Sequence, residues 1–78
     1  MTEYATIGTC LVCSQGRLII SRDDESGILY VLCEECESEW TCPEDSQDLD
    51  AATQAKHGRS TLLERGELEM HPWKAFLW

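Results

Sequence analysis

Two C-x2-C motifs constrain the fold of this chain more than any other feature. Cys10 and Cys13 form the first motif, Cys33 and Cys36 form the second, and nineteen residues lie between them. This spacing is typical of tetrahedral zinc sites, in which two tight turns present four thiolates to one ion at about 2.3 Å. We therefore expect one structural Zn²⁺ ion, in a closed shell that leaves no position for a catalytic water.

The remaining potential ligands leave alternatives to this assignment. Five cysteines fit four ligands plus a packed thiol at Cys42 better than disulfides do, and a replacement ligand is the alternative for Cys42. We expect His57 and His71 at the surface or at helix ends, against a site of three cysteines and one histidine. Iron is the chemical alternative to zinc, although rubredoxin-like knuckles usually carry glycine where Ser14 and Glu37 stand.

The length of the chain makes a bound metal important for stability. Seventy-eight residues make one small domain, and an apolar core of that size rarely supplies more than ~3–5 kcal/mol. A structural zinc contributes about 10–16 kcal/mol, so folding and metal binding should be one event. No signal peptide is recognised at residues 1–6, and the apolar runs are too short to cross a bilayer. We expect a cytoplasmic protein, where paired cysteines are more often metal ligands than disulfides.

A β-hairpin is predicted between the two motifs. Gly16 should let the chain turn away from the metal, and the β-branched run at 17–21 predicts a strand. A polar loop that ends at Gly27 leads to a returning strand at 28–32, which runs straight into Cys33.

Helices are predicted after the second motif. Pro43 and the acids that follow it are typical of a first helical turn, and this helix should end at Gly58. Thr61 to Glu64 fits a capping box for a second helix, which His71-Pro72 ends. The apolar tail 73–78 must pack on the domain or on a partner. The predicted fold is a small α+β metal-stabilised domain over 1–78, with a metal-binding hairpin at 5–42 that resembles a zinc ribbon and a helical extension with a Trp-rich tail at 43–78.

The charge of the chain is strongly negative and unevenly distributed. Eleven carboxylates and no Lys or Arg lie between Asp23 and Asp50, whereas residues 51–78 carry three acids and four bases. Four thiolates and one divalent ion would take the formal net charge from −9 to −11, because they add four negative and two positive charges. Such a surface repels phosphate backbones and attracts basic proteins. A solvated face that only keeps the protein soluble is the alternative, and calcium is disfavoured because no EF-hand spacing is present.

The candidate partner-binding residues come from this acidic stretch. They are Asp23, Asp24, Glu25, Glu34, Glu35, Glu37, Glu39, Trp40, Glu44 and Asp45. Trp40 is either an anchor at the interface or a lid over the metal. No nucleophile beside a base, no phosphate-binding glycine loop and no Ser/His/Asp grouping is recognisable, which predicts a protein without catalytic activity. We expect a monomer or a weak homodimer that binds neither nucleic acid nor membrane.

The two cysteine motifs resemble those of the zinc-ribbon superfamily, and the resemblance covers residues 5–42. Zinc ribbons serve in transcription factors, ribosomal proteins, rubredoxin-like proteins and protein-binding adaptors. Many nucleic-acid-binding ribbons have a basic hairpin tip, whereas Asp23, Asp24 and Glu25 stand at this tip. The second half of the chain looks like that of small bacterial ribbon proteins, and its size and charge resemble those of immunity proteins. These likenesses imply an inhibitor of a nuclease-like toxin, or alternatively an accessory module in transcription or translation.

Overall fold

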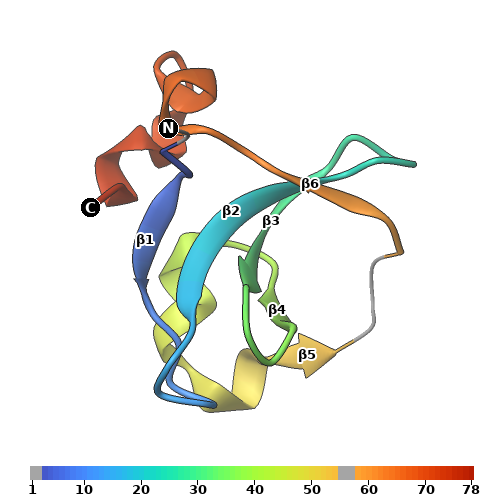
Figure 1. Ribbon diagram of the computed structural model, residues 1–78, viewed down its shortest axis with the longest axis vertical. Helices are drawn as coiled ribbons and strands as arrows, with labels where there is room; N and C mark the ends of the chain where they lie inside the picture. Colours follow the sequence, from blue (N-terminus) through green and yellow to red (C-terminus); the bar gives the residue numbers. More distant parts are fainter. Residues whose placement is uncertain (1–2, 55–57) are drawn as a thin grey trace.

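One antiparallel sheet forms the framework of the domain (Figure 1). The computed structural model describes residues 3–54 and 58–78. The strands are β1 (Thr6–Thr9), β2 (Arg17–Asp23), β3 (Leu29–Cys33), β4 (Ser38–Trp40), β5 (Thr53–Gln54) and β6 (Ser60–Leu62). β1 to β5 lie side by side in sequence order, and β6 pairs with β2. Among the described residues no helix is long and apolar enough to cross a membrane.

The central hairpin of β2 and β3 confirms the strands expected from the sequence. Its register runs from Leu18 opposite Cys33 to Arg22 opposite Leu29. The connecting loop is a tight turn in which Asp23 Oδ1 accepts hydrogen bonds from the backbone amides of Glu25 at 2.8 Å and Ser26 at 3.3 Å. Gly27 has a φ of 78°, a left-handed conformation that glycine adopts without a steric penalty.

β1 and β6 share one edge of β2. β1 covers the first part of that edge and β6 covers the second. Where the two meet, the backbone amide of Ile20 donates to the carbonyl of Ala5 at 2.9 Å, and Leu63 donates to Ile20 at 3.0 Å. Ala5 also donates to Leu63 at 2.8 Å. β6 therefore pairs backbone groups of β2 that β1 is too short to reach.

The predicted C-terminal helical extension, residues 43–78 of the expected fold, is wrong. The described residues contain no α-helix. Short 3-10 helices stand in its place: η1 (Pro43–Gln47), η2 (Leu49–Ala51), η3 (Arg65–Leu68) and η4 (Pro72–Phe76). The domain is thus a small β domain rather than an α+β domain. Residues 55–57, which the first predicted helix included, lie outside the described residues, as does the prediction for His57.

Competing local and long-range hydrogen bonds explain why these helices do not form. The side chain of Asp48 accepts from the backbone amide of Asp50 at 2.9 Å and so separates η1 from η2. Thr61, expected as a helix cap, lies in β6 opposite Arg22. A capping box does form, but three residues later, between Glu64 and Glu67 at the start of η3. The segment that helix propensity alone assigns to a second helix therefore forms β6, which pairs with the edge of β2 that β1 leaves uncovered.

Two hydrophobic cores lie along the sheet. The cysteine-containing core consists of Cys10, Leu18, Val31, Cys33 and Trp40. The terminal core consists of Ala5, Ile20, Leu63 and Leu68, and half-buried Trp73 and Leu77 pack against it.

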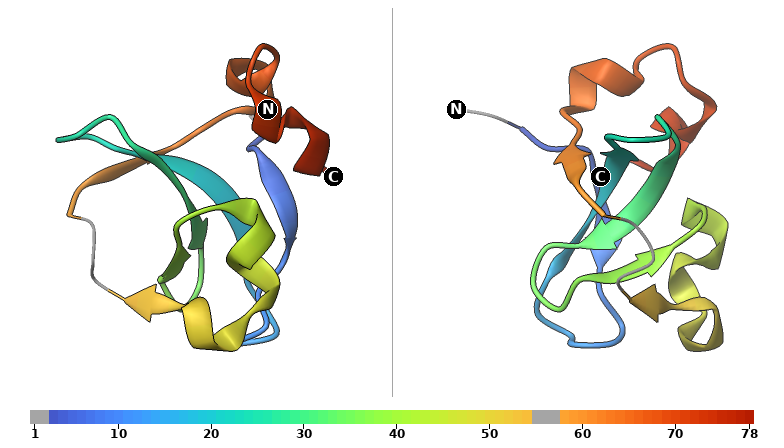
Figure 2. Two further views of the ribbon diagram at one scale, coloured as in Figure 1. Left: turned by 180° about the vertical axis from the view of Figure 1, so that it is seen from behind. Right: turned by 90° about the vertical axis from the view of Figure 1, so that its right-hand side faces the viewer.

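The C-terminal tail packs on the domain in part, because Trp73 and Leu77 contact the terminal core while Trp78 remains 67% exposed. The backbone amide of Trp78 donates to the carbonyl of Thr6 in β1 at 2.9 Å, and the Trp78 ring lies against Gly8. Figure 2 shows η3 and η4 at the end of the molecule where the chain begins, away from η1 and η2.

Candidate metal centre

Each C-x2-C motif forms a tight turn closed by a backbone hydrogen bond. The amide of Ser14 donates to the carbonyl of Cys10 at 3.0 Å, and Glu37 donates to Cys33 at 3.2 Å. Ser14 and Glu37 have positive φ angles of 59° and 62°. Non-glycine residues seldom adopt this conformation, so its occurrence at equivalent positions shows that both turns require it. The sequence lacks glycine at these two positions, yet the turns have the backbone that glycine would favour.

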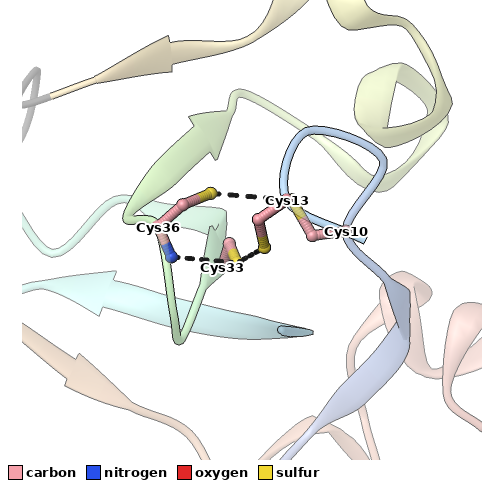
Figure 3. Close-up of side chains that lie close together, drawn as sticks. All are labelled: Cys10, Cys13, Cys33 and Cys36. Atoms are coloured by element: carbon pink, nitrogen blue, oxygen red, sulfur yellow. Dashed lines mark hydrogen bonds between the residues drawn. The ribbon is translucent and has the colours of Figure 1, made fainter. Parts of the chain in front are cut away.

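The four cysteine side chains converge on one point, as the sequence predicted (Figure 3). All four sulfurs lie within 4.8 Å of one another. The Sγ atoms of Cys10 and Cys36 are 3.7 Å apart, and those of Cys13 and Cys33 are 3.6 Å apart. A tetrahedral ion bound to four sulfurs at about 2.3 Å holds them about 3.8 Å apart. Since none of these cysteines is in a disulfide, the arrangement fits a tetrahedral divalent ion.

Backbone amides point at the sulfurs from within the turns. The amide of Val12 donates to Cys10 Sγ at 3.3 Å, and that of Gly16 donates to Cys13 Sγ at 3.4 Å. Cys33 Sγ accepts from the amides of residues 35 and 36, at 3.4 and 3.5 Å. Hydrogen bonds of this kind favour thiolate over thiol and fix the direction of each ligand.

A serine hydroxyl completes this set of contacts around the sulfurs. The thiol of Cys36 donates to Ser38 Oγ at 3.2 Å, and the Ser38 side chain is buried. Once Cys36 is a thiolate, the same hydroxyl can rotate and donate to the sulfur instead.

Residue 16 must be glycine because the second cysteine turn leaves no room for a side chain there. A Cβ atom at this position would lie 2.5 Å from Cys33 Sγ and 2.9 Å from the side chain of Glu35. Any other residue would therefore push one turn away from the other. Sequence reasoning singled out Gly16 for its backbone freedom, whereas the structure shows that it lets the two turns approach each other.

The surroundings divide the four sulfurs into two kinds. Hydrogen bonds from the backbone amides of Gln15 and Gly16 lower the pKa of Cys13 to about 6. Burial raises the pKa of Cys33 to about 12 and also raises the pKa of Cys10. At Cys36 burial opposes ionisation, but hydrogen bonds with Ser38 lower its pKa overall. The charge of a divalent ion offsets the cost of burying the two disfavoured thiolates.

The donor set defines what the centre can do chemically. Four thiolates in a tetrahedron suit zinc or iron and disfavour hard cations such as magnesium and calcium. With four protein ligands the coordination shell is closed, as it is in structural zinc sites. The residues therefore fit a metal ion with a structural role, and the donor set alone leaves zinc and iron as candidates.

Cys42 and His71 lie outside the four-sulfur group. Cys42 is half-buried, with its thiol 3.5 Å from Asp45 Oδ2, and burial raises its pKa. His71 stands at the start of η4, where its Nδ1 accepts from the amide of Trp73 at 3.0 Å. The expectation of a helix-end histidine is therefore confirmed for His71.

Trp40 packs in the cysteine-containing core, with an exposed fraction of 1%. Its indole Nε1 donates to the carbonyl of Asp48 at 3.0 Å. This position matches the lid considered for Trp40 in the sequence, because Trp40 packs with Cys10 and Cys33 and its indole reaches the residue between η1 and η2.

The acidic candidate residues lie in three environments. Asp23 and Glu39 are buried. Glu34 forms an ion pair with Arg17, which lowers the pKa of its carboxyl group through hydrogen bonds and charge. The exposed acids are Asp24, Glu25, Glu35, Glu37, Glu44 and Asp45. Asp24 and Glu25 stand at the tip of the β2–β3 hairpin, at the opposite end from the metal centre (Figure 1).

No protein-family model, curated protein or solved structure matches this chain. The zinc-ribbon likeness therefore depends on the four cysteines and the hairpin between them.

Proposed function

We propose that this protein is a non-catalytic zinc protein that binds a basic protein through acidic groups near its metal centre. The observation that carries the proposal is the convergence of four sulfurs at tetrahedral spacing. A closed tetrathiolate shell has no open position for a substrate or water, so the ion acts on structure.

The position of the cysteines in the sheet supports the structural role of the ion. Cys10 directly follows β1, and Cys13 stands four residues before β2. Cys33 is the last residue of β3, and Cys36 stands two residues before β4. One ion would thus link the ends of four strands, which suits a domain too small to depend on its apolar core alone.

The exposed carboxylates nearest the second turn support a basic partner. Glu35 and Glu37 lie in or directly after that turn, and Glu44 and Asp45 lie in η1, which packs against β3 and β4. The tetrathiolate centre would add a net charge of −2 at the same end of the sheet. Opposite charge on a partner would speed association and suppress binding to nucleic acid.

The concrete form of the proposal is a toxin-neutralising inhibitor that acts in the cytoplasm. A nuclease-like toxin must hold phosphate groups with Arg and Lys side chains, and carboxylates can occupy the same donors. Blocking such a site requires an acidic surface on a rigid support, and a metal-loaded sheet would provide that support.

Capture of a partner by the immobilised, metal-loaded protein tests this function. We expect the wild type to retain a basic protein and to release it as salt is raised. The double variant Glu44→Gln with Asp45→Asn should weaken retention. Glu3→Gln with Glu69→Gln removes the same charge at exposed positions elsewhere and should change retention little. Capture of nucleic acid, or equal retention by both double variants, would contradict the proposal.

A further inference from the structure

The four clustered sulfurs form two close pairs, and each pair joins one cysteine turn to the other (Figure 3). The Sγ atoms of Cys10 and Cys36 are 3.7 Å apart. Those of Cys13 and Cys33 are 3.6 Å apart. Because a disulfide bond is about 2.05 Å long, each sulfur would have to move by less than about 1 Å for either pair to be joined. The arrangement that fits a metal ion therefore also fits two disulfides between the turns.

Each pair combines one buried sulfur with one that solvent can reach. Cys10 and Cys33 have exposed fractions of 1% and 0%, whereas Cys13 and Cys36 are half-buried. A small oxidant in solution therefore meets Cys13 and Cys36 first. The buried cysteine of each pair then lies next to the oxidised sulfur, where a resolving cysteine must stand.

The close approach of the two turns is built into the backbone. The amide of Cys10 donates to the carbonyl of Gly16 at 2.9 Å, and the amide of Glu34 donates to the carbonyl of Arg17 at 3.1 Å. Both turns are thus hydrogen-bonded to the same two neighbouring residues at the start of β2. Gly16 also leaves the space beside Cys33 open, since a Cβ atom there would lie 2.5 Å from the Cys33 sulfur.

We propose that this centre is a redox-sensitive site, in which hydrogen peroxide oxidises the four cysteines to the disulfides Cys10–Cys36 and Cys13–Cys33 and the bound ion is released. In each pair the accessible thiolate attacks one peroxide oxygen, which breaks the O–O bond, forms a sulfenic acid and releases hydroxide. The buried thiolate then attacks the sulfenic sulfur, so that the S–S bond forms and a second hydroxide leaves. Two peroxide molecules thereby take up the four electrons that four thiolates lose. The site then holds no thiolate, and the thiolate is the form that binds metal.

The two possible kinds of pairing have different consequences for the fold. Disulfides between the turns join residues that are 26 and 20 positions apart in the chain, so they would replace the ion as a cross-link. Disulfides within each C-x2-C motif would leave the two turns unconnected. We therefore expect the oxidised, metal-free protein to keep the NMR dispersion of its cysteine-containing core, whereas chelation under reducing conditions should not.

The direct test is a peroxide titration of the zinc-loaded wild type, with released zinc measured by a chromophoric chelator. We expect one zinc ion to be released for every two peroxide molecules consumed. The product should be lighter than the reduced metal-free chain by four hydrogen atoms, and thiol reductant with added zinc should restore the starting material. Release that requires sulfinic or sulfonic acid formation, or that reductant does not reverse, would overturn the proposal.

Peptide mapping of the same product determines the pairing. Trypsin cleaves after Arg17 and Arg22, which lie between the two motifs. The peptides that carry the two turns should therefore stay linked until they are reduced, and fragmentation in the mass spectrometer should assign the two predicted pairs. Separate peptides, each with its own internal disulfide, would overturn the proposal.

Cys42 serves as a control within the same chain. It lies outside the four-sulfur group, its thiol is 3.5 Å from Asp45 Oδ2, and burial raises its pKa. We expect Cys42 to remain free to react with an alkylating reagent after the zinc is released, and Cys42→Ser to release zinc at the rate of the wild type. A disulfide that includes Cys42 in the main product would contradict the assigned pairs.

A matched pair of variants tests whether the approach of the turns selects the pairing. Gly16→Ala forces the turns apart, so in excess zinc the yield of linked peptides should fall at least about twofold, because disulfides tolerate little extra separation of their Cα atoms. Gly66→Ala adds the same methyl where no atom lies within 4 Å and should give the wild-type yield. Equal yields from the two variants would overturn the assignment of the pairs.

This inference depends on the metal centre and not on the basic partner. If peroxide releases the ion and links the turns while no basic protein is captured, the proposed function fails and the redox-sensitive site stands. If a basic protein is captured and peroxide yields only disulfides within the motifs, the redox inference fails and the proposed function stands.

Discussion

The two hydrophobic cores of this domain differ in the side chains that fill them. The terminal core closes with apolar side chains, and the backbone junction between β1, β2 and β6 holds it in place. The cysteine-containing core has two of the four clustered thiols among its five buried residues. Where the terminal core holds leucine and isoleucine, this core holds two of the sulfurs that could bind a metal ion. The difference predicts that a bound metal ion stabilises one end of the sheet and not the other.

The largest expected effect is the loss of one ligand. Cys33→Ser should abolish stoichiometric metal binding and leave the cysteine-containing core open, because the hydroxyl is a poor ligand for a soft site. Circular dichroism and NMR dispersion measure the outcome. The control is Cys42→Ser, which lies outside the four-sulfur group and should change the free energy of unfolding by less than about 1 kcal/mol. A folded Cys33→Ser protein with full metal content would show that the cysteine-containing core does not depend on its four-sulfur site.

Gly16→Ala should come next in size. The added methyl would meet Cys33 Sγ at 2.5 Å, so the turns must separate and the metal should bind more weakly by at least about a hundredfold. Competition with a chromophoric chelator measures this affinity. Gly66→Ala introduces the same methyl where no atom lies within 4 Å and should leave metal affinity unchanged. Equal affinity for both variants would show that the turns have more freedom than the geometry allows.

Leu68→Ala examines the terminal core alone. Leu68 has an exposed fraction of 1%, and truncating such a leucine costs about 2–5 kcal/mol. Chemical denaturation of the metal-loaded protein measures the loss, and metal affinity of the folded protein should stay the same. Leu49→Ala, at an exposed position, should cost much less. A parallel loss of metal affinity in Leu68→Ala would mean that the two cores are one cooperative unit at the metal site.

Ser38→Ala should give the smallest effect at the metal end. It removes the hydroxyl that contacts Cys36 Sγ, and loss of such a supporting contact typically weakens metal binding about tenfold to a hundredfold. We expect the lower end of that range, because Cys36 remains a ligand. The spectrum of the cobalt-substituted protein should shift while tetrahedral coordination is kept. An unchanged spectrum and an unchanged metal affinity would show that the Ser38 hydroxyl does not support metal binding by Cys36.

The cysteine cluster and the hairpin were predictable because their signals are local. Each pair of cysteines lies within one turn, and the β-branched run after Gly16 needs only its neighbours to be recognised as a strand. Even here, the positive φ of Ser14 and Glu37 had no sequence signal, because neither is glycine. The turn itself imposes that conformation.

The second half of the chain was not predictable for the opposite reason. β6 exists because β1 leaves part of the β2 edge uncovered, and nothing near Thr61 in the sequence reveals that edge. Long-range pairing of this kind overrides helix propensity whenever backbone groups would otherwise stay unpaired.

Metal analysis of the purified protein, before and after chelation, tests whether a bound ion holds the cysteine-containing core together. We predict one zinc ion per chain by mass spectrometry and, once the ion is removed, loss of NMR dispersion first among the residues of the cysteine-containing core. Protein that contains no stoichiometric metal and shows the same spectrum with and without chelator would rule out a structural metal ion at the four cysteines.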